Sequence, residues 1–337
     1  MTTRRPTIND VAARAGVSKS LVSLAIRGSD KVSDDSRALI LQAAEELGYR
    51  PNAAARNLAD RRSHTIGVLL HDLHNPIFAE VLDGVQEVVR AQGYRMMLVT
   101  GHGDPGREAS ELATLLEFQV EGLILISHRL DPRLARRVAR ERPVVIVTRQ
   151  DITGPGITTV CTDDQLGART AVEHLISLGH TRIAHISGGG NQIARDREIG
   201  YRAAMTAAGL AHAIHIESGD FTESSGKTAA MAVLASRPET TSMFVANDLS
   251  AIGALVATQE SGRDVPGDVS IVGYDGMALA ALGSLNLTTM AQPFAAMGRD
   301  AAERLFRRIE SPKARLAPSQ VVSELLPRGT TGPPQKA

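Results

Sequence analysis

Residues 7–23 read TINDVAARAGVSKSLVS, and residues 49–59 read YRPNAAARNLA. Thr7 and Asp10 predict the start of a first helix, because a hydroxyl and a carboxylate stabilise the free N–H groups and positive dipole at a helix N-terminus. Gly16 supplies a turn, and Ser18 is a suitable cap for a second helix. This spacing predicts a helix-turn-helix, whose second helix enters the major groove of double-stranded DNA.

The second and third helices are predicted to close a small core with the first. Leu21, Val22 and Ala25 are expected to face inward, and Lys19, Ser20 and Ser23 to stay outside. Ser33 caps a third helix that ends at Gly48, with the apolar positions Leu39, Ile40, Ala43 and Leu47. Any amphipathic helical hairpin could show this spacing. The prediction of DNA binding therefore also depends on the Gly16 turn, the linker that follows and the charge.

The charge is divided unevenly along the chain. Residues 1–62 hold 11 Lys and Arg against 7 Asp and Glu, a net charge of +4, and the remaining residues hold 26 against 30, a net charge of −4. A basic segment is attracted to the phosphates of nucleic acid. The neutral total therefore combines a basic head with an acidic body.

Length and composition bound the class of protein. A chain of 337 residues is expected to form two or three units. Its single cysteine, Cys161, excludes an intramolecular disulfide and is expected to be an inert thiol at the end of a short apolar run. Neither a signal peptide nor an 18-residue apolar stretch is evident, so we expect a cytoplasmic protein with no membrane contact.

From residue 64 onward, short apolar runs alternate with helical patterns. The runs at 65–70, 95–100, 122–127 and 144–148 predict parallel strands joined by crossover helices, and the pattern restarts at 182–187, 214–216, 242–247 and 269–275. Gly84 and Gly93 are nine residues apart in one predicted helix, and Gly200 and Gly209 repeat this separation. The sequence therefore predicts two similar α/β lobes.

Several motifs together resemble the LacI/GalR family of bacterial transcription regulators, from Thr7 to about Leu326. They are VS at 32–33, EELGYRPN at 45–52, TIGV at 65–68, NPIF at 75–78, HLISLGH at 174–180, ND at 247–248 and LTTMAQP at 287–293. The resemblance implies a three-helix DNA-binding head at 1–50, a hinge helix and linker at 51–63, and a periplasmic-binding-protein-like core at 64–337. In that core, lobe 1 would span about 64–162 and 293–326, with a helix from Phe294 to Ile309, and lobe 2 about 163–292.

Polar residues follow most of the predicted strands, where ligands of open α/β sheets bind. They are His71, Asp72, Ser127, His128, Thr148, Arg149, Asp163, Ser187, Asn247, Asp248 and Asp275. Each alone could be a cap or turn residue, but together they suggest a cleft for a polyol. The resemblance implies effector contacts at Arg197, Asn247, Asp275 and Gln292 with apolar walls at Phe78, Phe221 and Phe294, and we add His71 and Thr148 from their strand ends.

The resemblance also assigns roles in the head. Lys19, Ser20 and Ser23 are expected at base edges, and Leu58 either wedges into the minor groove or only packs its hinge helix. Further DNA contacts, mainly with phosphates, are expected from Thr7, Ser18, Ser33, Tyr49, Asn52 and Ala55.

Two departures from the family pattern leave alternatives open. Thr148 and Arg149 stand where relatives often have an Asp, so a phosphorylated or acidic effector is an alternative to a sugar. Leu24 and Arg27 replace a common base-reading Arg and a common Asn, so the operator sequence is expected to be unusual.

Catalytic and cofactor motifs are not supported. Residues 101–106 read GHGDPG, but no acid follows the next strand, as a dinucleotide site requires, and Phe221 breaks the phosphate-loop spacing before Gly226. No metal-ligand pair is expected on one helix face, and no cofactor is predicted. A sugar-binding transport component is the competing class, which the DNA-binding head opposes, and an enzyme is the third.

The resulting prediction is a ligand-responsive regulator, expected to be a repressor. It would act as a homodimer on a near-palindromic operator, with a small-molecule effector between the lobes of each core. A dimer and no larger assembly is expected, because the tail after Leu316 lacks coiled-coil heptads. Whether the effector induces or co-represses stays open.

Overall fold

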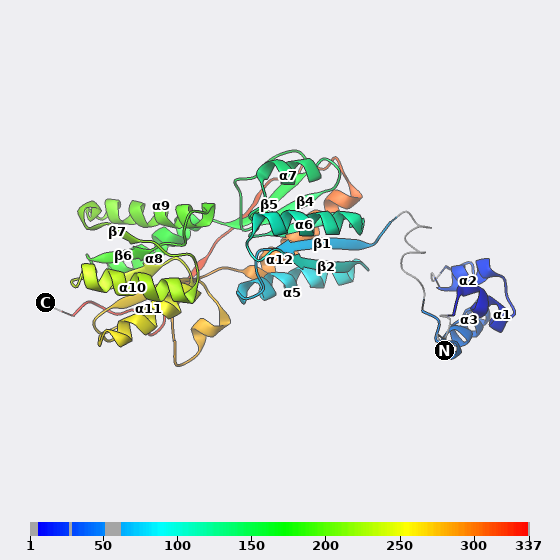
Figure 1. The fold of residues 1–337 in the computed structure, drawn as a ribbon, viewed down its shortest axis with the longest axis horizontal. Coiled ribbons are helices and arrows are strands. Elements are labelled where there is room, and N and C mark those ends of the chain that lie inside the picture. The colour runs from blue at the N-terminus through cyan, green and yellow to red at the C-terminus, as the bar shows by residue number, and fades with distance from the viewer. Residues whose placement is uncertain (1–5, 27–28, 51–61, 336–337) are drawn as a thin grey trace. The chain divides into compact units, whose positions relative to one another are not determined.

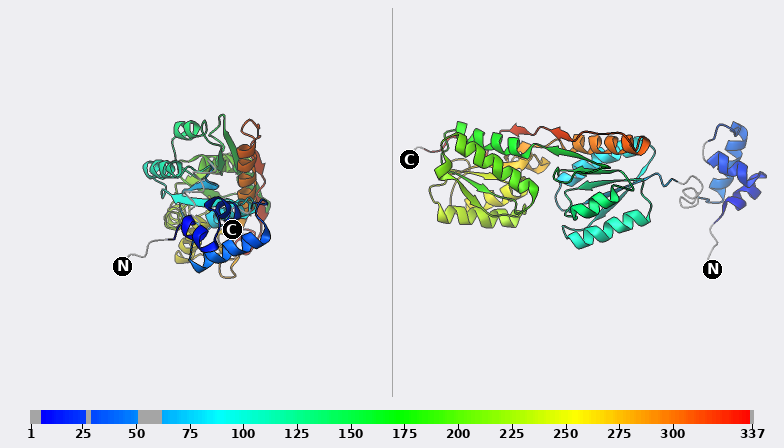
Figure 2. Two further views of the ribbon diagram at one scale, coloured as in Figure 1. Left: turned by 90° about the vertical axis from the view of Figure 1, so that its right-hand side faces the viewer. Right: turned by 90° about the horizontal axis from the view of Figure 1, so that it is seen from above.

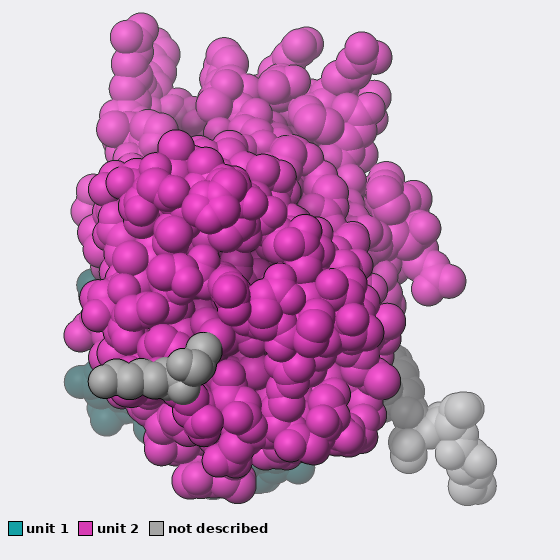
Figure 3. Space-filling view, turned by 90° about the vertical axis from the view of Figure 1, so that its left-hand side faces the viewer, with its two compact units in different colours: residues 1–63 teal, residues 64–337 magenta. Residues whose placement is uncertain are grey.

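The computed structural model describes residues 6–26, 29–50 and 62–335. The chain forms two compact units, residues 1–63 and residues 64–337 (Figure 3). Arg27, Asn52, Ala55 and Leu58, and with them most of the expected hinge, lie outside the described residues.

The first unit contains the predicted helices α1 (Ile8–Ala15), α2 (Lys19–Ile26) and α3 (Asp34–Glu46). Asp10 accepts hydrogen bonds from the backbone N–H and the hydroxyl of Thr7, both at 2.7 Å. Ser18 and Ser33 cap α2 and α3 by accepting backbone N–H groups. Gly16 adopts a left-handed φ of 66°, which a residue without a Cβ tolerates and which separates α1 from α2.

The core of the head is formed by small and branched side chains. Val11, Val22 and Ile40 are fully buried at its centre. The sequence prediction was wrong for Leu39, whose side chain is 49% exposed. Leu39 and Ile40 are neighbours about 100° apart around α3, so only one of them can face the narrow core formed with α1 and α2.

The larger unit contains two six-stranded sheets, which confirms the predicted α/β class (Figure 1). The first sheet has the order β11-β5-β4-β3-β1-β2, and every neighbouring pair in it is parallel. Its strands are β1 (Thr65–Leu70), β2 (Arg95–Thr100), β3 (Gly122–Ile126), β4 (Val144–Val147), β5 (Ile157–Thr162) and β11 (Ser319–Val321).

The second sheet repeats this order as β12-β10-β9-β8-β6-β7, with only β12 antiparallel to its neighbour β10. The strands are β6 (Ile183–Ile186), β7 (His215–Glu217), β8 (Ser242–Val245), β9 (Ser270–Asp275), β10 (Thr288–Ala291) and β12 (Glu324–Leu326). Short 3-10 helices, Ala211–Ala213 and Ala278–Ala281, precede β7 and β10. Position by position, β1 to β5 of lobe 1 therefore correspond to β6 to β10 of lobe 2.

Helices cover both faces of each sheet (Figure 2). In lobe 1, α5 (Ile77–Ala91) and α12 (Phe294–Glu310) pack on one face, and α6 (Pro105–Glu117) and α7 (Pro132–Val138) on the other. In lobe 2, α8 (Asp164–Ser177) and α9 (Gln192–Ala207) oppose α10 (Glu223–Ser236) and α11 (Asp248–Glu260). None of the described helices is long and apolar enough to cross a membrane.

The glycine repeat seen in the sequence marks a close helix contact in each lobe. A Cβ added to Gly84 in α5 would lie 2.0 Å from the carbonyl oxygen of Ala295, and one added to Gly298 would lie 2.0 Å from that of Val81. The absence of side chains at these two positions therefore lets α5 and α12 cross with their backbones nearly touching.

The chain crosses between the lobes three times, after β5, after β10 and between β11 and β12. The sequence prediction assigned everything from 293 to 326 to lobe 1, and this was wrong for β12. Leu325 and its neighbours pair with Met290 of β10, and Thr330 hydrogen-bonds to the backbone of Ile271. The tail therefore closes the edge of the second sheet, whereas β11 closes the first.

Candidate functional site

A cavity of about 800 Å³ lies between the lobes at the carboxyl ends of their strands. All nine residues that the sequence suggested for the effector line it: His71, Phe78, Thr148, Arg197, Phe221, Asn247, Asp275, Gln292 and Phe294. A volume of this size is typical of small-molecule sites.

Three other strand-end residues from the sequence prediction do not line this cavity. Asp163 caps α8, where its carboxylate accepts the backbone N–H of Leu166 at 2.9 Å. Asp248 is fully buried behind the cavity wall. Ser187 is not among the lining residues either, and the wall there begins at Gly188.

A buried guanidinium is the centre of the lobe 2 wall. Nε of Arg197 donates to Asp164 at 2.8 Å, and Nη1 donates to the carbonyl oxygen of Ala246 and lies 3.5 Å from Oδ1 of Asp275. Burial opposes the charge of Arg197, but the adjacent carboxylates of Asp164 and Asp275 raise its pKa above the ordinary value. Arg197 therefore stays charged inside the protein.

Asp275 connects this network to a crossing segment. Its Oδ1 also accepts the side-chain N–H of Gln292 at 2.8 Å, and Gln292 in turn accepts the hydroxyl of Thr162 at 2.7 Å. Burial raises the pKa of Asp275 to about 6, although the charge of Arg197 lowers it. Burial and the charge of Asp275 raise the pKa of Asp248 to about 7. Asp275 thus lines the cavity with a pKa close to neutral, and Asp248 is buried outside the cavity lining.

Aromatic rings surround the same guanidinium. The Cζ atom of Arg197 lies 3.7 Å from the ring centre of Tyr274 and 5.9 Å from that of Phe221. Phe78 and Phe294 are almost fully buried and belong to the lobe 1 core, so only their edges contribute to the cavity wall. An apolar ring face next to charged groups suits a sugar, which has both C–H faces and hydroxyls.

Backbone strain is concentrated around the cavity. Ser127, Thr148, Phe221 and Asp275 all line it and have left-handed φ values of 49°, 73°, 71° and 113°. Residues with a Cβ rarely adopt such angles, at a cost of about 1–3 kcal/mol each. The fold therefore holds these side chains at fixed positions against local preference, which is common at binding sites.

The part of the lobe 1 wall at the ends of β3 and β4 contains a pair of hydroxyls and an ion pair. The hydroxyls of Ser127 and Thr148 lie 2.7 Å apart. Arg149 donates to both oxygens of Asp151 and to the carbonyl oxygen of His128. Burial, followed by the charge of Arg149, lowers the pKa of His128 to about 3, so this imidazole is neutral.

Sequence reasoning missed Asp164 and Tyr274 as parts of this site. Asp163 was predicted at the site instead, because it follows the short apolar run that ends at Cys161. The turn at the start of α8 instead uses Asp163 as the cap, so that Asp164 points to Arg197. A signal was present for Tyr274, because it precedes Asp275 in a strand that is buried along its whole length.

In the head, the structure exposes Lys19 and Ser20 at the start of α2, and Ser23 is half-buried one turn later. Leu24 packs partly against the head core, as does Tyr49. Thr7, Ser18 and Ser33 are the N-caps of the three helices. A cap at a helix N-terminus keeps N–H groups near the surface, where phosphate oxygens can accept them.

The architecture defines a class of protein. A small helix-turn-helix unit precedes a two-lobed core with a polar cavity, as in regulators that combine DNA binding with ligand binding. Residues 7–52 match the family of bacterial regulatory proteins of the lacI family, and residues 63–325 match the periplasmic binding proteins and sugar binding domain of the LacI family. The chain belongs to the LacI family of transcription regulators.

Similar proteins cover nearly the whole chain. The HTH-type transcriptional regulator CelR of Thermobifida fusca is 38% identical over 316 residues, which are 91% of this chain and 92% of CelR. A solved structure described as a transcriptional regulator CelR–cellobiose complex covers 97% of this chain and 100% of its own, with 32% identity and a TM-score of 0.72. The Lac repressor dimer bound to operator and the anti-inducer ONPF covers 98% and 100%, with 30% identity and a TM-score of 0.88.

These comparisons confirm the predicted family and function. The chain is a sequence-specific DNA-binding transcription regulator with an effector-binding core, and it is not an enzyme. The alternative of a transport component with the same core is therefore rejected.

Proposed function

We propose that the protein is a repressor controlled by a neutral, hydroxyl-rich effector that binds in the interlobe cavity, with a sugar or sugar derivative as the ligand. The observation that carries this proposal is the buried group of Arg197, Asp164 and Asp275. Among the described residues, Arg197 uses only Nε and Nη1, and the hydrogen bonds to Asp275 end on Oδ1. Nη2 and Oδ2 stay available as a donor and an acceptor, the pair that a hydroxyl group requires.

The charges next to Arg197 favour a neutral ligand over an acidic one at that point of the cavity. Two buried carboxylates adjoin one guanidinium in the lobe 2 wall, and the positive charge of Arg149 is already paired with Asp151. A phosphate or carboxylate group would add negative charge next to Asp164 and Asp275. A phosphorylated effector is therefore disfavoured, although Arg149 made it an alternative at the sequence level.

The remaining predicted residues complete the proposed site. Asn247 caps α11 through its side-chain oxygen, and its amide donates to the carbonyl oxygen of Phe221 at 3.1 Å. Its position fixes the loop that carries the Phe221 ring. The complex of the relative CelR with cellobiose supports a carbohydrate ligand for this family core.

On DNA, we propose that Lys19, Ser20 and Ser23 read bases, and that Thr7, Ser18, Ser33 and Tyr49 position the head on phosphates. Asn52 is proposed to contact phosphate as well, Ala55 is proposed as a further DNA contact, and Leu58 is proposed, from the family resemblance, to wedge into the minor groove. The working unit is a homodimer on a near-palindromic operator, which the Lac repressor dimer on its operator supports. A bacterial regulator that reads chromosomal DNA acts in the cytoplasm.

Effector and operator are coupled through the lobes. If ligand binding changes the lobe arrangement and the spacing of the paired heads, operator affinity changes by the coupling free energy, typically ~1–3 kcal/mol. Such a movement must act at the three crossing segments. Two of these, after β5 and after β10, are tied together by the hydrogen bond between Thr162 and Gln292, and Gln292 also contacts Asp275.

Calorimetric titration of the full-length dimer tests the effector. We expect binding of a neutral mono- or disaccharide from a panel that includes cellobiose and ribose, weaker binding of the matching sugar phosphates, and a change of operator affinity by the bound sugar. Tight binding of a sugar phosphate without binding of the neutral sugar would contradict the charge argument.

Selection of operator sequences from a random library tests the head. Ser20→Ala should change base preference at one position of each half-site, because a base contact specifies sequence. Asn52→Ala, which removes a proposed phosphate contact, should weaken binding to all sequences and leave the preference unchanged. The same selected sequences for Ser20→Ala and the parent would remove Ser20 from the reading set.

A further inference from the structure

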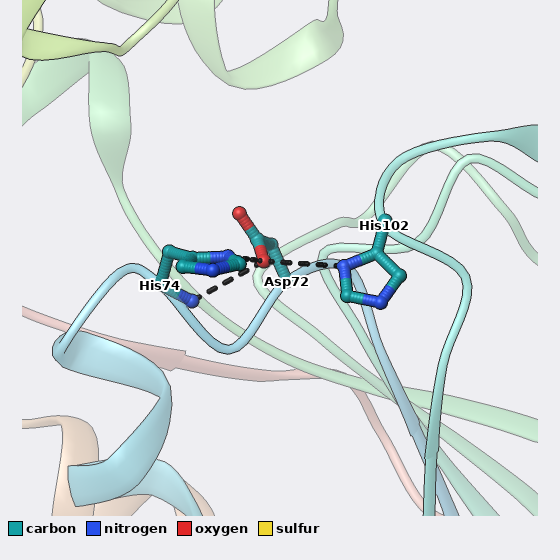
Figure 4. Close-up of side chains that lie close together, drawn as sticks. All are labelled: Asp72, His74 and His102. Carbon is teal, nitrogen blue, oxygen red and sulfur yellow. Dashed lines mark hydrogen bonds and ion pairs between the residues drawn. The ribbon is translucent and has the colours of Figure 1, made fainter.

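Three metal-binding side chains meet at the rim of lobe 1, outside the group around Arg197. Asp72 and His74 belong to the loop after β1, and His102 belongs to the loop after β2 (Figure 4). Nδ1 of His74 lies 2.6 Å from Oδ1 of Asp72, and Nδ1 of His102 lies 3.7 Å from the same oxygen. In Figure 4 the two imidazoles lie on either side of the carboxylate.

The sheet register explains why these distant residues meet. β1 and β2 are parallel neighbours, and Leu70 at the end of β1 pairs with Thr100 at the end of β2. Two hydrogen bonds tie the following loops together, because the carbonyl oxygen of His71 accepts the N–H of Gly103 at 3.0 Å and the hydroxyl of Thr100 at 3.3 Å. The backbone positions of Asp72 and His102 are therefore fixed relative to each other.

We propose that Asp72, His74 and His102 form a binding site for a divalent transition-metal ion such as Zn²⁺. Each residue offers one ligand atom, and these atoms all lie within 4.8 Å of one another. Bonds of ~2.0–2.1 Å in a tetrahedral site place neighbouring ligand atoms about 3.3 Å apart. The three side chains are already close to that spacing.

Only a small adjustment separates the observed arrangement from a coordinated one. The His74 side chain is 82% exposed, so its imidazole can rotate away from Asp72 without disturbing packing. Two imidazoles and one carboxylate suit Zn²⁺, Ni²⁺ or Cu²⁺, whereas Mg²⁺ and Ca²⁺ prefer a shell of oxygens. The types of ligand atom, like the spacing between them, therefore favour a transition-metal ion over Mg²⁺ or Ca²⁺.

The site also adjoins the interlobe cavity. Asp72 and His74 line that cavity, and three protein ligands leave a fourth tetrahedral position for water or another donor. A metal ion held there would lie beside the cavity wall, next to the proposed effector contact His71 and apart from the group around Arg197. This metal site does not depend on the identity of the effector.

Titration of the metal-free, full-length protein with ZnCl₂ and with CoCl₂ tests the proposal. We expect one strong Zn²⁺ site per chain, a visible Co²⁺ absorption band of tetrahedral type, and no binding of Mg²⁺ or Ca²⁺ under the same conditions. His102→Ala and His74→Ala should each weaken Zn²⁺ binding by at least about tenfold and abolish the Co²⁺ band, because a lost ligand costs at least as much as a lost outer partner.

A matched control separates this site from adventitious binding to surface histidines. His212 is exposed in the short helix Ala211–Ala213 of lobe 2, and His212→Ala should leave Zn²⁺ affinity and the Co²⁺ band unchanged. Thermal unfolding of each variant by circular dichroism checks that the fold is intact. Three results would each overturn the proposal. The folded variants His74→Ala and His102→Ala could keep the Zn²⁺ affinity of the parent, or His212→Ala could lose as much Zn²⁺ affinity as they do. The third result is Mg²⁺ binding as strong as Zn²⁺ binding.

Discussion

The two lobes of the core share one topology, but equivalent strand ends in their cavity walls differ in charge. The end of β4 in lobe 1 corresponds to the end of β9 in lobe 2, and Thr148 and Asp275 occupy these equivalent places. Both have left-handed φ values and both line the cavity. Thr148 shares a hydrogen bond with the hydroxyl of Ser127, whereas Asp275 adjoins a buried guanidinium.

This difference indicates a division of labour between the walls. The charged groups near the crossing segments are rigidly connected, because Arg197 contacts Asp164, Asp275 and the backbone of Ala246. In lobe 1 the hydroxyls of Ser127 and Thr148 are neutral and hydrogen-bond to each other. We infer that lobe 2 provides most of the affinity for the effector and that lobe 1 refines its selection.

The largest effect is expected for Arg197→Ala. This change leaves Asp164 and Asp275 without their buried cation, and breaking a buried ion pair costs about 3–5 kcal/mol of unfolding free energy. Effector binding should become undetectable by calorimetry, and urea denaturation should report the loss of stability in the core. Operator binding without effector should persist in the folded fraction, because Arg197 lies outside the DNA-binding unit. Retained effector affinity would refute the central role of lobe 2.

A pH dependence is expected from Asp275. Its pKa is raised to about 6, so the free folded protein holds a proton that the unfolded chain releases near pH 4, and this stabilisation is lost as pH rises through about 6. A sugar hydroxyl that donates to the carboxylate favours the charged form, so effector affinity should fall as pH drops below about 6.

Calorimetry from pH 5 to pH 8 measures this dependence, and Asp275→Asn is the control. The variant should bind the effector more weakly near pH 7 and show a flatter profile. Asp248, with a pKa raised to about 7 by burial and the charge of Asp275, stays in the variant and accounts for any slope that remains. A profile as steep as that of the parent would assign the dependence to another group.

Much of this architecture was predictable because it follows local rules. Thr7, Gly16 and Ser33 define helix ends through caps and a turn, and the apolar runs from Thr65 onward define buried parallel strands. The lobe repeat was visible in Gly84 and Gly200, where a Cβ would meet a backbone carbonyl oxygen of a neighbouring helix at 2.0 and 2.3 Å. These signals depend on neighbours in the sequence.

The missed features depend on pairings between distant segments. β12 joins the second sheet through Leu325, which no local pattern reveals, and the exposure of Leu39 depends on where α1 and α2 lie. Histidines that could bind a metal were not expected to pair on one helix face. Asp72, His74 and His102 instead come together on two loops, because β1 and β2 are neighbours in register.

The smallest effect is expected for Thr148→Val, which tests the lobe 1 wall directly. The change keeps the shape of the side chain and removes the hydroxyl that lies 2.7 Å from that of Ser127. One neutral hydrogen bond contributes about 0.5–1.5 kcal/mol, so the effector should bind roughly threefold to tenfold more weakly. Stability should change little, because both side chains are only half-buried and water can replace the lost partner.

Calorimetry with the preferred sugar and with its deoxy analogues measures the effect of Thr148→Val on effector affinity. If one deoxy sugar binds to the parent and to Thr148→Val with equal affinity, the hydroxyl missing from that sugar is the one that Thr148 contacts. Loss of binding as complete as in Arg197→Ala would show that both walls contribute equally, and the inferred division between the lobes would be wrong.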